Sequence, residues 1–98
     1  MTEEGLIKKQ ITDRLRLCGW LVLRMQGGKV RHNVVMQLPG MPDLECISPD
    51  GRIVWIEVKT HDGVVSPDQL AMHEDLEMRN QEVLIARSVE DIEELVDV

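Results

Sequence analysis

The sequence predicts an α/β protein in which a mixed central sheet is flanked by helices. The expected order is helix, strand, an uncertain strand, strand, strand, helix, strand, helix. Two observations predict this class: apolar residues recur at helical spacing near the N-terminus, and short runs rich in β-branched residues follow them. The length of 98 residues is enough for one domain, residues 1–98, with a modest core.

The first part of the chain predicts a helix followed by a strand. A helix is expected over residues 2–18, and Gly19 is its expected stop. Its apolar positions follow one another at spacings of four, four and three: Ile7, Ile11, Leu15 and Cys18. Residues 20–25 form an apolar run typical of a strand, which the glycine pair at 27–28 breaks. Residues 30–38 fit either a strand or a mobile loop with a basic start.

A hairpin is predicted next. Residues 43–47 and 52–59 read as strands, and the turn-forming residues 48–51, Ser-Pro-Asp-Gly, join them. The second strand is rich in β-branched residues and apolar on both faces. We therefore expect it to be a central strand that is covered on both sides.

After a loop over residues 60–65, a second helix is expected from residue 66 to about residue 80. Its start has favourable chemistry, because Ser66 can cap, Pro67 fits the first helical position and Gln69 can complete a capping box.

The chain is predicted to end with a strand and an acidic helix. Residues 82–87 read as a strand, and Ser88 is the expected cap of a helix over residues 89–96.

Composition excludes several classes of protein. Aromatic residues make up 2% of the chain, which argues against a protein that binds single strands by stacking bases. No run of about 18 apolar residues and no signal peptide is visible, so we expect no membrane association. Cys18 and Cys46 are expected to be reduced, buried thiols of a cytoplasmic protein.

The net charge of −7 is unevenly distributed. Residues 1–60 hold nine Lys and Arg against seven Asp and Glu, whereas residues 61–98 hold two against eleven. Residues 8–31 contain one acid, Asp13, and seven basic residues: Lys8, Lys9, Arg14, Arg16, Arg24, Lys29 and Arg31. Such a local positive surface can bind phosphates, because charges are screened within about 10 Å. The plainer interpretation is a solvated surface with scattered charges.

The strand over residues 52–59 ends in an unusual way. Side chains two residues apart in a strand share a face, so Glu57 and Lys59 lie side by side at its C-terminal end. Taken alone, this pair is better explained as a partly exposed ion pair where the strand reaches solvent.

Asp43 changes this interpretation, because the hairpin folds its strand back along that of Glu57. Counting outward from the turn places Asp43 near residues 55–57. Two carboxylates and Lys59 then converge at one end of the hairpin. Two carboxylates with a backbone carbonyl such as that of Val58 suit Mg²⁺ or Mn²⁺ rather than zinc.

These residues resemble a known family. Gly40-Met41-Pro42-Asp43, followed after a hairpin by Ile56-Glu57-Val58-Lys59, resembles the PD-(D/E)xK nuclease superfamily. More narrowly, the chain resembles the VRR-NUC family in its short stand-alone form, found in phages and bacteria. The resemblance covers nearly the whole chain, from the acidic first helix through Gly19 to Ser66-Pro67-Asp68-Gln69. It implies a restriction-endonuclease-like core. It also implies that the protein is located in the cytoplasm of a bacterial or phage-infected cell.

The resemblance also implies residue roles. Asp43 and Glu57 match the family's metal-binding carboxylates, Val58 would add its carbonyl, and Lys59 matches the catalytic lysine. The implied cofactor is Mg²⁺ or Mn²⁺. A nearby metal lowers the pKa of bound water and polarises a phosphoryl oxygen.

Two further matches have local explanations that stay open. Gln69 matches a glutamine that the family directs at its site, but it is also suited to capping only. Glu4 matches an acid on the first helix and lies about 20° from Ile11 on a helical wheel, on the buried face. The alternative is a frayed first-turn acid that is favoured by the helix dipole. Glu3 is expected to face solvent.

One position departs from the family pattern: Lys8 stands where a polar uncharged residue, often Gln, is expected. It is one of six residues that we expect to contact nucleic acid: Lys8, Lys9, Arg24, Lys29, Arg31 and His61. His32 and His73 lack the spacing of a zinc site, and we expect surface or substrate-side positions for them.

The preferred functional hypothesis is an endonuclease that depends on Mg²⁺ or Mn²⁺ and hydrolyses DNA phosphodiester bonds. The resemblance to Holliday-junction resolvases favours branched DNA as the substrate. Symmetric cutting of a junction needs two active centres related by a two-fold axis, so a homodimer is expected. Two alternatives remain: a non-catalytic DNA-binding or assembly module with a nuclease fold, and a generic α/β protein with a fortuitous ion pair.

Overall fold

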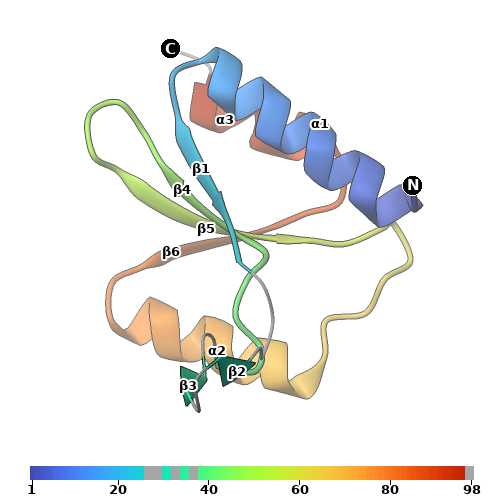
Figure 1. Cartoon of the computed structure of the whole chain (residues 1–98), viewed down its shortest axis with the longest axis vertical. Coiled ribbons are helices and arrows are strands. Elements are labelled where there is room, and N and C mark those ends of the chain that lie inside the picture. The colour runs from blue at the N-terminus through green and yellow to red at the C-terminus, as the bar shows by residue number, and fades with distance from the viewer. Residues whose placement is uncertain (26–29, 32–33, 36–37, 97–98) are drawn as a thin grey trace.

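The computed structural model describes residues 1–25, 30–31, 34–35 and 38–96, with the backbone alone at 30–31 and 34–35. It has the predicted α/β architecture (Figure 1). The elements in chain order are α1 (Glu3–Leu17), β1 (Leu21–Arg24), β2 (Val30–Arg31), β3 (Val34–Val35), β4 (Leu44–Ile47), β5 (Ile53–Val58), α2 (Pro67–Met78), β6 (Glu82–Ala86), the 3₁₀ helix η1 (Val89–Ile92) and α3 (Glu93–Val96).

The main sheet has four strands in the order β1-β4-β5-β6. β1 pairs with β4 and β4 with β5 in antiparallel fashion, whereas β5 and β6 are parallel and joined through α2. The mixed sheet and the interior position of β5 therefore confirm the prediction. The segment 30–38 contains β2 and β3, which form a separate antiparallel pair, and its residues 32–33 and 36–37 lie outside the described part of the chain.

The core lies between one face of this sheet and the helices α1 and α3 with η1. Ile11 and Leu15 of α1, Ile56 of β5 and Ile92 of η1 are all inaccessible to solvent. Thr2 starts α1 as predicted, because its hydroxyl accepts the backbone N–H of Gly5 at 3.0 Å. The remaining buried apolar residues of the cluster are Ile7, Trp20, Val22, Leu44, Cys46, Val54, Val58, Ala86 and Val96.

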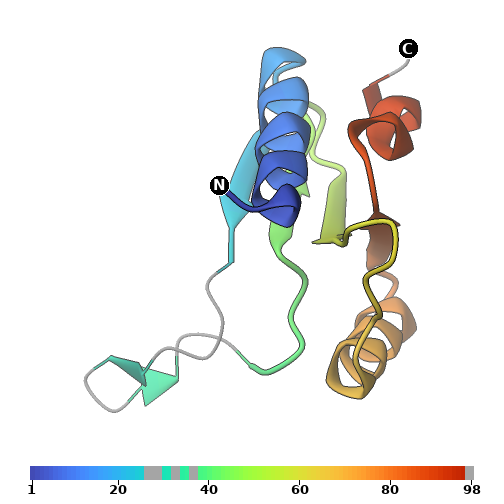
Figure 2. The same ribbon diagram turned by 90° about the vertical axis from the view of Figure 1, so that its right-hand side faces the viewer.

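The other face of the sheet is only partly covered, so the expectation that β5 is covered on both sides is met at Glu57 and only in part at Ile53 and Trp55. Ile53 and Trp55 of β5 are half-buried, and Leu21 and Leu23 of the edge strand β1 are 55% and 38% exposed. Helix α2 packs against β6 at one end of the sheet, away from α1 (Figures 1 and 2). The apolar residues of this face therefore pack partly against one another and stay accessible to solvent.

Helix α2 begins with the predicted capping box. The hydroxyl of Ser66 accepts the N–H of Gln69 at 3.2 Å, and the side-chain oxygen of Gln69 accepts the N–H of Ser66 at 2.9 Å. Pro67 occupies the first turn as expected, and Arg79 is the C-cap. Asn80 follows with φ of +62°, a left-handed conformation that asparagine tolerates.

The C-terminal helix differs from the prediction. The segment is divided into η1 and α3, and the Ser88 side chain makes no capping hydrogen bond. The Asp91 carboxylate instead accepts the backbone N–H of Arg87 at 2.8 Å, and the Asp91 N–H donates to the Ser88 carbonyl at 3.1 Å. The i to i+3 bond is the tighter 3₁₀ pattern that short helix starts commonly use.

Both cysteines are free thiols. Cys46 is buried as predicted, and burial raises the pKa of its thiol to about 12. Cys18 is half-buried, which corrects the expectation for this residue, and its sulfur accepts a hydrogen bond from Arg14 at 3.2 Å. Among the helices of the described residues, none is both long and apolar enough to cross a membrane.

Candidate functional site

The hairpin β4–β5 brings Asp43 and Glu57 together. Leu44 pairs with Ile56, so Asp43, one residue earlier, lies opposite Glu57, as the sequence predicts. The backbone N–H of Val58 donates to Asp43 Oδ2 at 2.8 Å, which fixes the carboxylate against the end of β5.

The turn before Asp43 packs against the start of α2. Gly40 has φ of +84°, and a Cβ at this position would lie 2.3 Å from the backbone oxygen of Asp68. Only glycine allows this approach, because any side chain would collide with backbone atoms. The contact places the segment that leads through Asp43 into β4 beside the helix that carries Gln69 and His73.

Glu57 is almost fully buried, with 1% of its surface exposed. The pKa of the Glu57 carboxyl is raised from 4.5 to about 8, mostly by burial, then by the hydrogen bond and charge of Asp43, and least by the charge of Glu4. Lys59 acts in the opposite direction and lowers this pKa. Two carboxyl groups this close cannot both ionise easily without a cation, so at neutral pH the pair favours retention of a proton.

One oxygen of Glu57 has no partner among the residues that the structure describes. Within this part of the chain, Glu57 Oε1 and His73 Nε2 are both buried without a hydrogen-bond partner, and they lie 3.7 Å apart. An unsatisfied buried polar group costs about 1–3 kcal/mol. The two adjacent atoms are therefore available to bind a cation or a proton.

The oxygen atoms at this rim fit a hard divalent cation. In a strand the N–H and C=O of one residue point to the same side of the strand. The Val58 N–H points to Asp43, so the Val58 carbonyl points to that side as well. Among the residues that the structure describes, no group of three or more His, Cys, Asp and Glu side chains is arranged to hold a metal ion. The oxygen atoms that could hold a cation here are those of Asp43, Glu57 and the Val58 carbonyl, and such a set would suit Mg²⁺ or Mn²⁺.

Two lysines lie at the same rim. Lys59 follows β5, is partly exposed, and its charge lowers the pKa of both Glu57 and His73, which places it near this pair. Lys8 comes from α1, and its Nζ lies 3.4 Å from Asp43 Oδ1 with 25% of the side chain exposed. We expected Lys8 to contact nucleic acid, and the structure places it on the Asp43 carboxylate.

The two acids of the first turn of α1 are both exposed. Glu4 lies in the turn before Ile7, the first buried residue of α1, and is exposed, so its expected position on the buried face is wrong. Its charge still reaches Glu57, whose pKa it raises. Glu3 faces solvent as expected, 3.8 Å from His61 Nδ1.

Gln69 makes the capping interactions that its position allowed. Its side-chain oxygen is engaged by the N–H of Ser66. The capping interpretation is therefore confirmed, and a role of Gln69 in chemistry stays a prediction.

His73 is the residue that sequence reasoning missed. We expect a surface or substrate-side position for it, but only 5% of it is exposed and its ring lies beside Glu57. A sequence signal did exist, because His73 follows Gln69 by four residues and so shares its face of the helix.

Arg87 is also absent from the sequence-based site, although it shapes the loop after Lys59. Its guanidinium donates to the backbone oxygens of Thr60 at 2.7 Å and Gly63 at 2.8 Å. No local sequence pattern predicts this contact, because it forms only when β5 and β6 pair.

The basic segment is partly neutralised. Lys9 pairs with Asp13 at 2.5 Å, and Arg14 forms two hydrogen bonds of 3.0 Å with Glu93.

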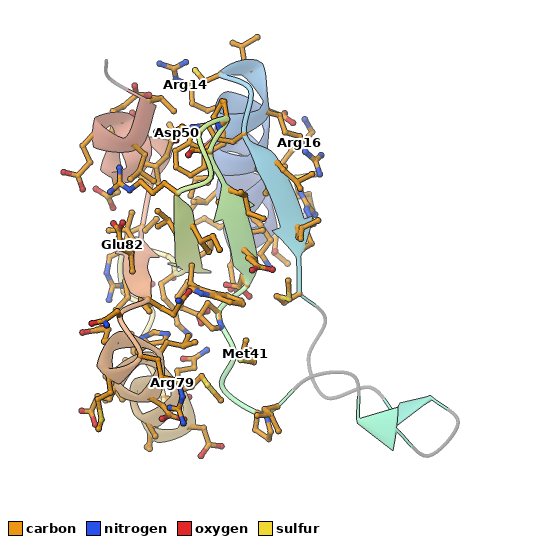
Figure 3. The ribbon with its side chains drawn as sticks, turned by 90° about the vertical axis from the view of Figure 1, so that its left-hand side faces the viewer. Arg14, Arg16, Met41, Asp50, Arg79 and Glu82 are labelled. Atoms are coloured by element: carbon orange, nitrogen blue, oxygen red, sulfur yellow. The ribbon has the colours of Figure 1, made fainter. Side chains whose placement is uncertain are left out.

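Two arginines of this segment lie at the outer edge of β1. Arg16 (Figure 3) and Arg24 are exposed, and both lower the pKa of Asp13, after the larger effect of Lys9. His61 is exposed as well. Lys29 and the side chain of Arg31 lie outside the described residues.

A pocket lies at the opposite end of the hairpin. It has a volume of about 400 Å³ and is lined in part by Cys18, Asp50, Arg52 and Glu94. The residues predicted for the site are not among those that line it, so the chemistry is better placed at the Asp43–Glu57 rim.

Comparison with known proteins agrees with this placement of the elements. No protein-family model matches the chain, and no curated protein matches it. Among solved structures, the chain is similar to a protein described as a VRR_NUC domain, with a TM-score of 0.78 and 28% sequence identity. The match covers 99% of this chain and 97% of that one. The chain is thus similar over nearly its entire length to a VRR_NUC domain. This similarity supports a relationship to the VRR-NUC family.

Proposed function

We propose that the chain is a metal-dependent nuclease of the PD-(D/E)xK type that hydrolyses DNA phosphodiester bonds. The observation that carries this proposal is the gathering of Asp43, Glu57 and Lys59 at one rim of the sheet. The similarity to a VRR_NUC domain over 99% of the chain supports the same reading.

Asp43, Glu57 and the Val58 carbonyl would hold the cation, and their oxygen atoms favour Mg²⁺ or Mn²⁺. When bound, such an ion lowers the pKa of a coordinated water and polarises a phosphoryl oxygen. The buried position of Glu57 strengthens its interaction with any charge nearby, because water screens little there.

Lys59 would supply the remaining positive charge. Its compact ammonium group would orient the attacking water or stabilise charge that develops on the phosphoryl oxygens. Lys8 balances part of the Asp43 charge. The exposed Arg16 and Arg24 would contact the DNA backbone, so binding should weaken as salt rises.

We further propose that the protein acts on branched DNA as a homodimer. One 98-residue chain offers one centre, and symmetric cutting of a junction needs two. The half-exposed apolar face of the sheet, with Leu21, Leu23, Ile53 and Trp55, supports a second copy as its cover.

A non-catalytic DNA-binding module is the second candidate. It is favoured by one observation: both oxygens of Asp43 already have partners, Lys8 and the N–H of Val58. A nuclease would have to exchange at least the Lys8 contact when a cation binds.

The deciding experiment incubates the protein with labelled four-way junctions, flaps and single strands in Mg²⁺ or Mn²⁺, with EDTA as the control. Wild type is expected to cut, whereas Lys59→Ala and Asp43→Ala are expected to lose cutting but keep the wild-type circular dichroism spectrum. Arg79→Ala is the matched control, since Arg79 is exposed and pairs with Asp75 on α2. If wild type binds these DNAs but cuts none with either metal, the non-catalytic module replaces the nuclease.

A further inference from the structure

A buried histidine lies behind the candidate metal ligand Glu57. His73 Nε2 is 3.7 Å from Glu57 Oε1, and the two side chains are 6% and 2% exposed. Neither atom has a hydrogen-bond partner in the described part of the chain. Buried polar atoms are nearly always paired, so two adjacent unpaired ones point to an interaction between them.

The chemistry of the two groups is complementary. A neutral imidazole carries one N–H, on either of its two ring nitrogens. With that proton on Nε2, the ring is a donor and Glu57 Oε1 is an acceptor. The separation exceeds a normal hydrogen bond by only a few tenths of an ångström, which a small rotation of either side chain removes.

Such a bond would decide how the Glu57 carboxylate is turned. The terminal torsion of a glutamate is broad and roughly two-fold, so a carboxylate held at one oxygen presents the other in a fixed direction. The pairing of β4 with β5 also places Asp43 opposite Glu57, on the metal-binding side. The helix position of His73 is itself fixed by the packing of α2 on β6.

We propose that His73 is a positioning residue, which donates from Nε2 to Glu57 Oε1 and so directs the second oxygen of Glu57 toward Asp43 and a divalent cation. The inference rests on the proposed function, because it assigns Glu57 to the metal. Groups that orient metal ligands in this way typically change metal affinity about 10–100-fold when they are removed.

The test measures Mn²⁺ binding by electron paramagnetic resonance of the free ion, at one fixed pH and without DNA. His73→Leu replaces the imidazole with an apolar side chain of similar bulk that has no donor, and it should raise the Mn²⁺ dissociation constant about 10-fold or more. His73→Gln offers an amide N–H and should restore most of the affinity. Glu74→Gln is the matched control, because Glu74 is exposed on the same helix.

Each outcome separates this inference from the function on which it rests. If wild type binds no Mn²⁺, the metal-dependent function fails and the inference fails with it. If wild type and folded His73→Leu bind Mn²⁺ equally well, only the inference is overturned. The same holds if His73→Gln binds as weakly as His73→Leu, since the donor is then not what matters.

A second measurement distinguishes positioning from direct ligation. Electron spin-echo spectra of bound Mn²⁺ should show no nitrogen coupling, because His73 acts through Glu57. A histidine nitrogen coupling that disappears in His73→Leu would overturn the positioning role and make His73 a ligand. In cleavage assays, His73→Leu should raise the metal concentration for half-maximal rate and leave the KM for DNA unchanged.

Discussion

Glu57 is a carboxylic acid at the buried end of an apolar strand. It keeps this position although burial and Asp43 both penalise its charge and raise its pKa to about 8. A side chain that served stability alone would be apolar here, because removing a buried charge commonly stabilises a protein. The cost is consistent with a group that is retained for binding a cation or a proton.

The raised pKa predicts how stability depends on pH in EDTA. Between its ordinary value of 4.5 and about 8, the folded protein holds a proton on Glu57 that the unfolded chain releases. The free energy of unfolding should therefore fall as pH rises, by at most about 1.4 kcal/mol per pH unit. His73, whose pKa is lowered from 6.5 by burial, acts in the opposite sense, and mainly below that pH. The window from pH 6.5 to about 8 thus isolates Glu57.

Urea denaturation across this window measures the effect, and Glu57→Gln is the control. The variant should show a flatter profile than wild type and should be more stable than wild type at pH 8. An equal fall in both proteins would mean that other groups cause the pH dependence.

Sequence reasoning located the residues whose position follows from strand periodicity and a tight turn. Asp43, Glu57 and Lys59 come together because the register of a hairpin is set by its turn. The prediction that Glu4 lies on the buried face is wrong, because a helical wheel gives the direction of a side chain around the helix axis. It does not give the point along the axis at which the helix extends beyond the core. His73 was missed, because burial of a polar residue depends on which helix packs on which strand.

At the scale of elements, the contact between the turn at Gly40 and helix α2 holds the site together. The turn carries Asp43 into β4, and the helix carries His73 toward β5. The close approach depends on a missing side chain and not on a hydrogen bond. We therefore expect it to be sensitive to the addition of a single methyl group.

Gly40→Ala should destabilise the protein more than Gly51→Ala does. Both glycines have positive φ, +84° and +93°. Backbone strain in each alanine variant should therefore lower the free energy of unfolding by about 1–2 kcal/mol. Gly51 has nothing within 4 Å of an added Cβ, whereas at Gly40 the added atom collides with Asp68. Overpacking should cost Gly40→Ala about a further 1–3 kcal/mol. Thermal unfolding compares the two, and equal losses would show that the contact is not tight in solution.

The capping box offers a test of Gln69. Ser66→Ala removes one of its hydrogen bonds and should cost about 1 kcal/mol, with cleavage unchanged. Gln69→Ala removes the reciprocal bond and should lower stability by a similar amount. If Gln69 also serves the chemistry, this variant alone should lose cleavage activity at a temperature where both variants are folded. Equal activity of the two would limit Gln69 to capping.

Most elements were predictable, because their signals are local. The capping box at Ser66, the stop at Gly19 and the turn over residues 48–51 each follow from the conformational preferences of one or two residues. The coverage of the sheet was not predictable in this way. The apolar face of β5 with Trp55 looks the same in sequence whether a helix covers it or solvent reaches it.

The molecule as a whole has two unlike sheet faces. α1, η1 and α3 close one face, and the view in Figure 3 looks onto the other, with α1 behind the sheet. Positive side chains lie along the β1 edge and acidic ones dominate the C-terminal third. The open face and the basic edge are thus adjacent on one side of the molecule.

This arrangement predicts a dimer through the open face. Light scattering should give twice the chain mass of 11.2 kDa at micromolar concentration. Leu23→Glu should give a monomer, because Leu23 lies on that face and is 38% exposed. Leu17→Glu is the control, since Leu17 is 82% exposed at the end of α1 and should leave the dimer intact. A wild-type mass of one chain, with and without DNA, would contradict the dimer.

The central claim is that Asp43 and Glu57 together hold a divalent cation at the rim of the sheet. Anomalous diffraction from a crystal soaked in Mn²⁺ tests it most directly, because it locates the metal independently of any activity. We expect one or two anomalous peaks between these carboxylates and the Val58 carbonyl. Carboxylates that turn apart, with no peak between them at saturating Mn²⁺, would contradict the account.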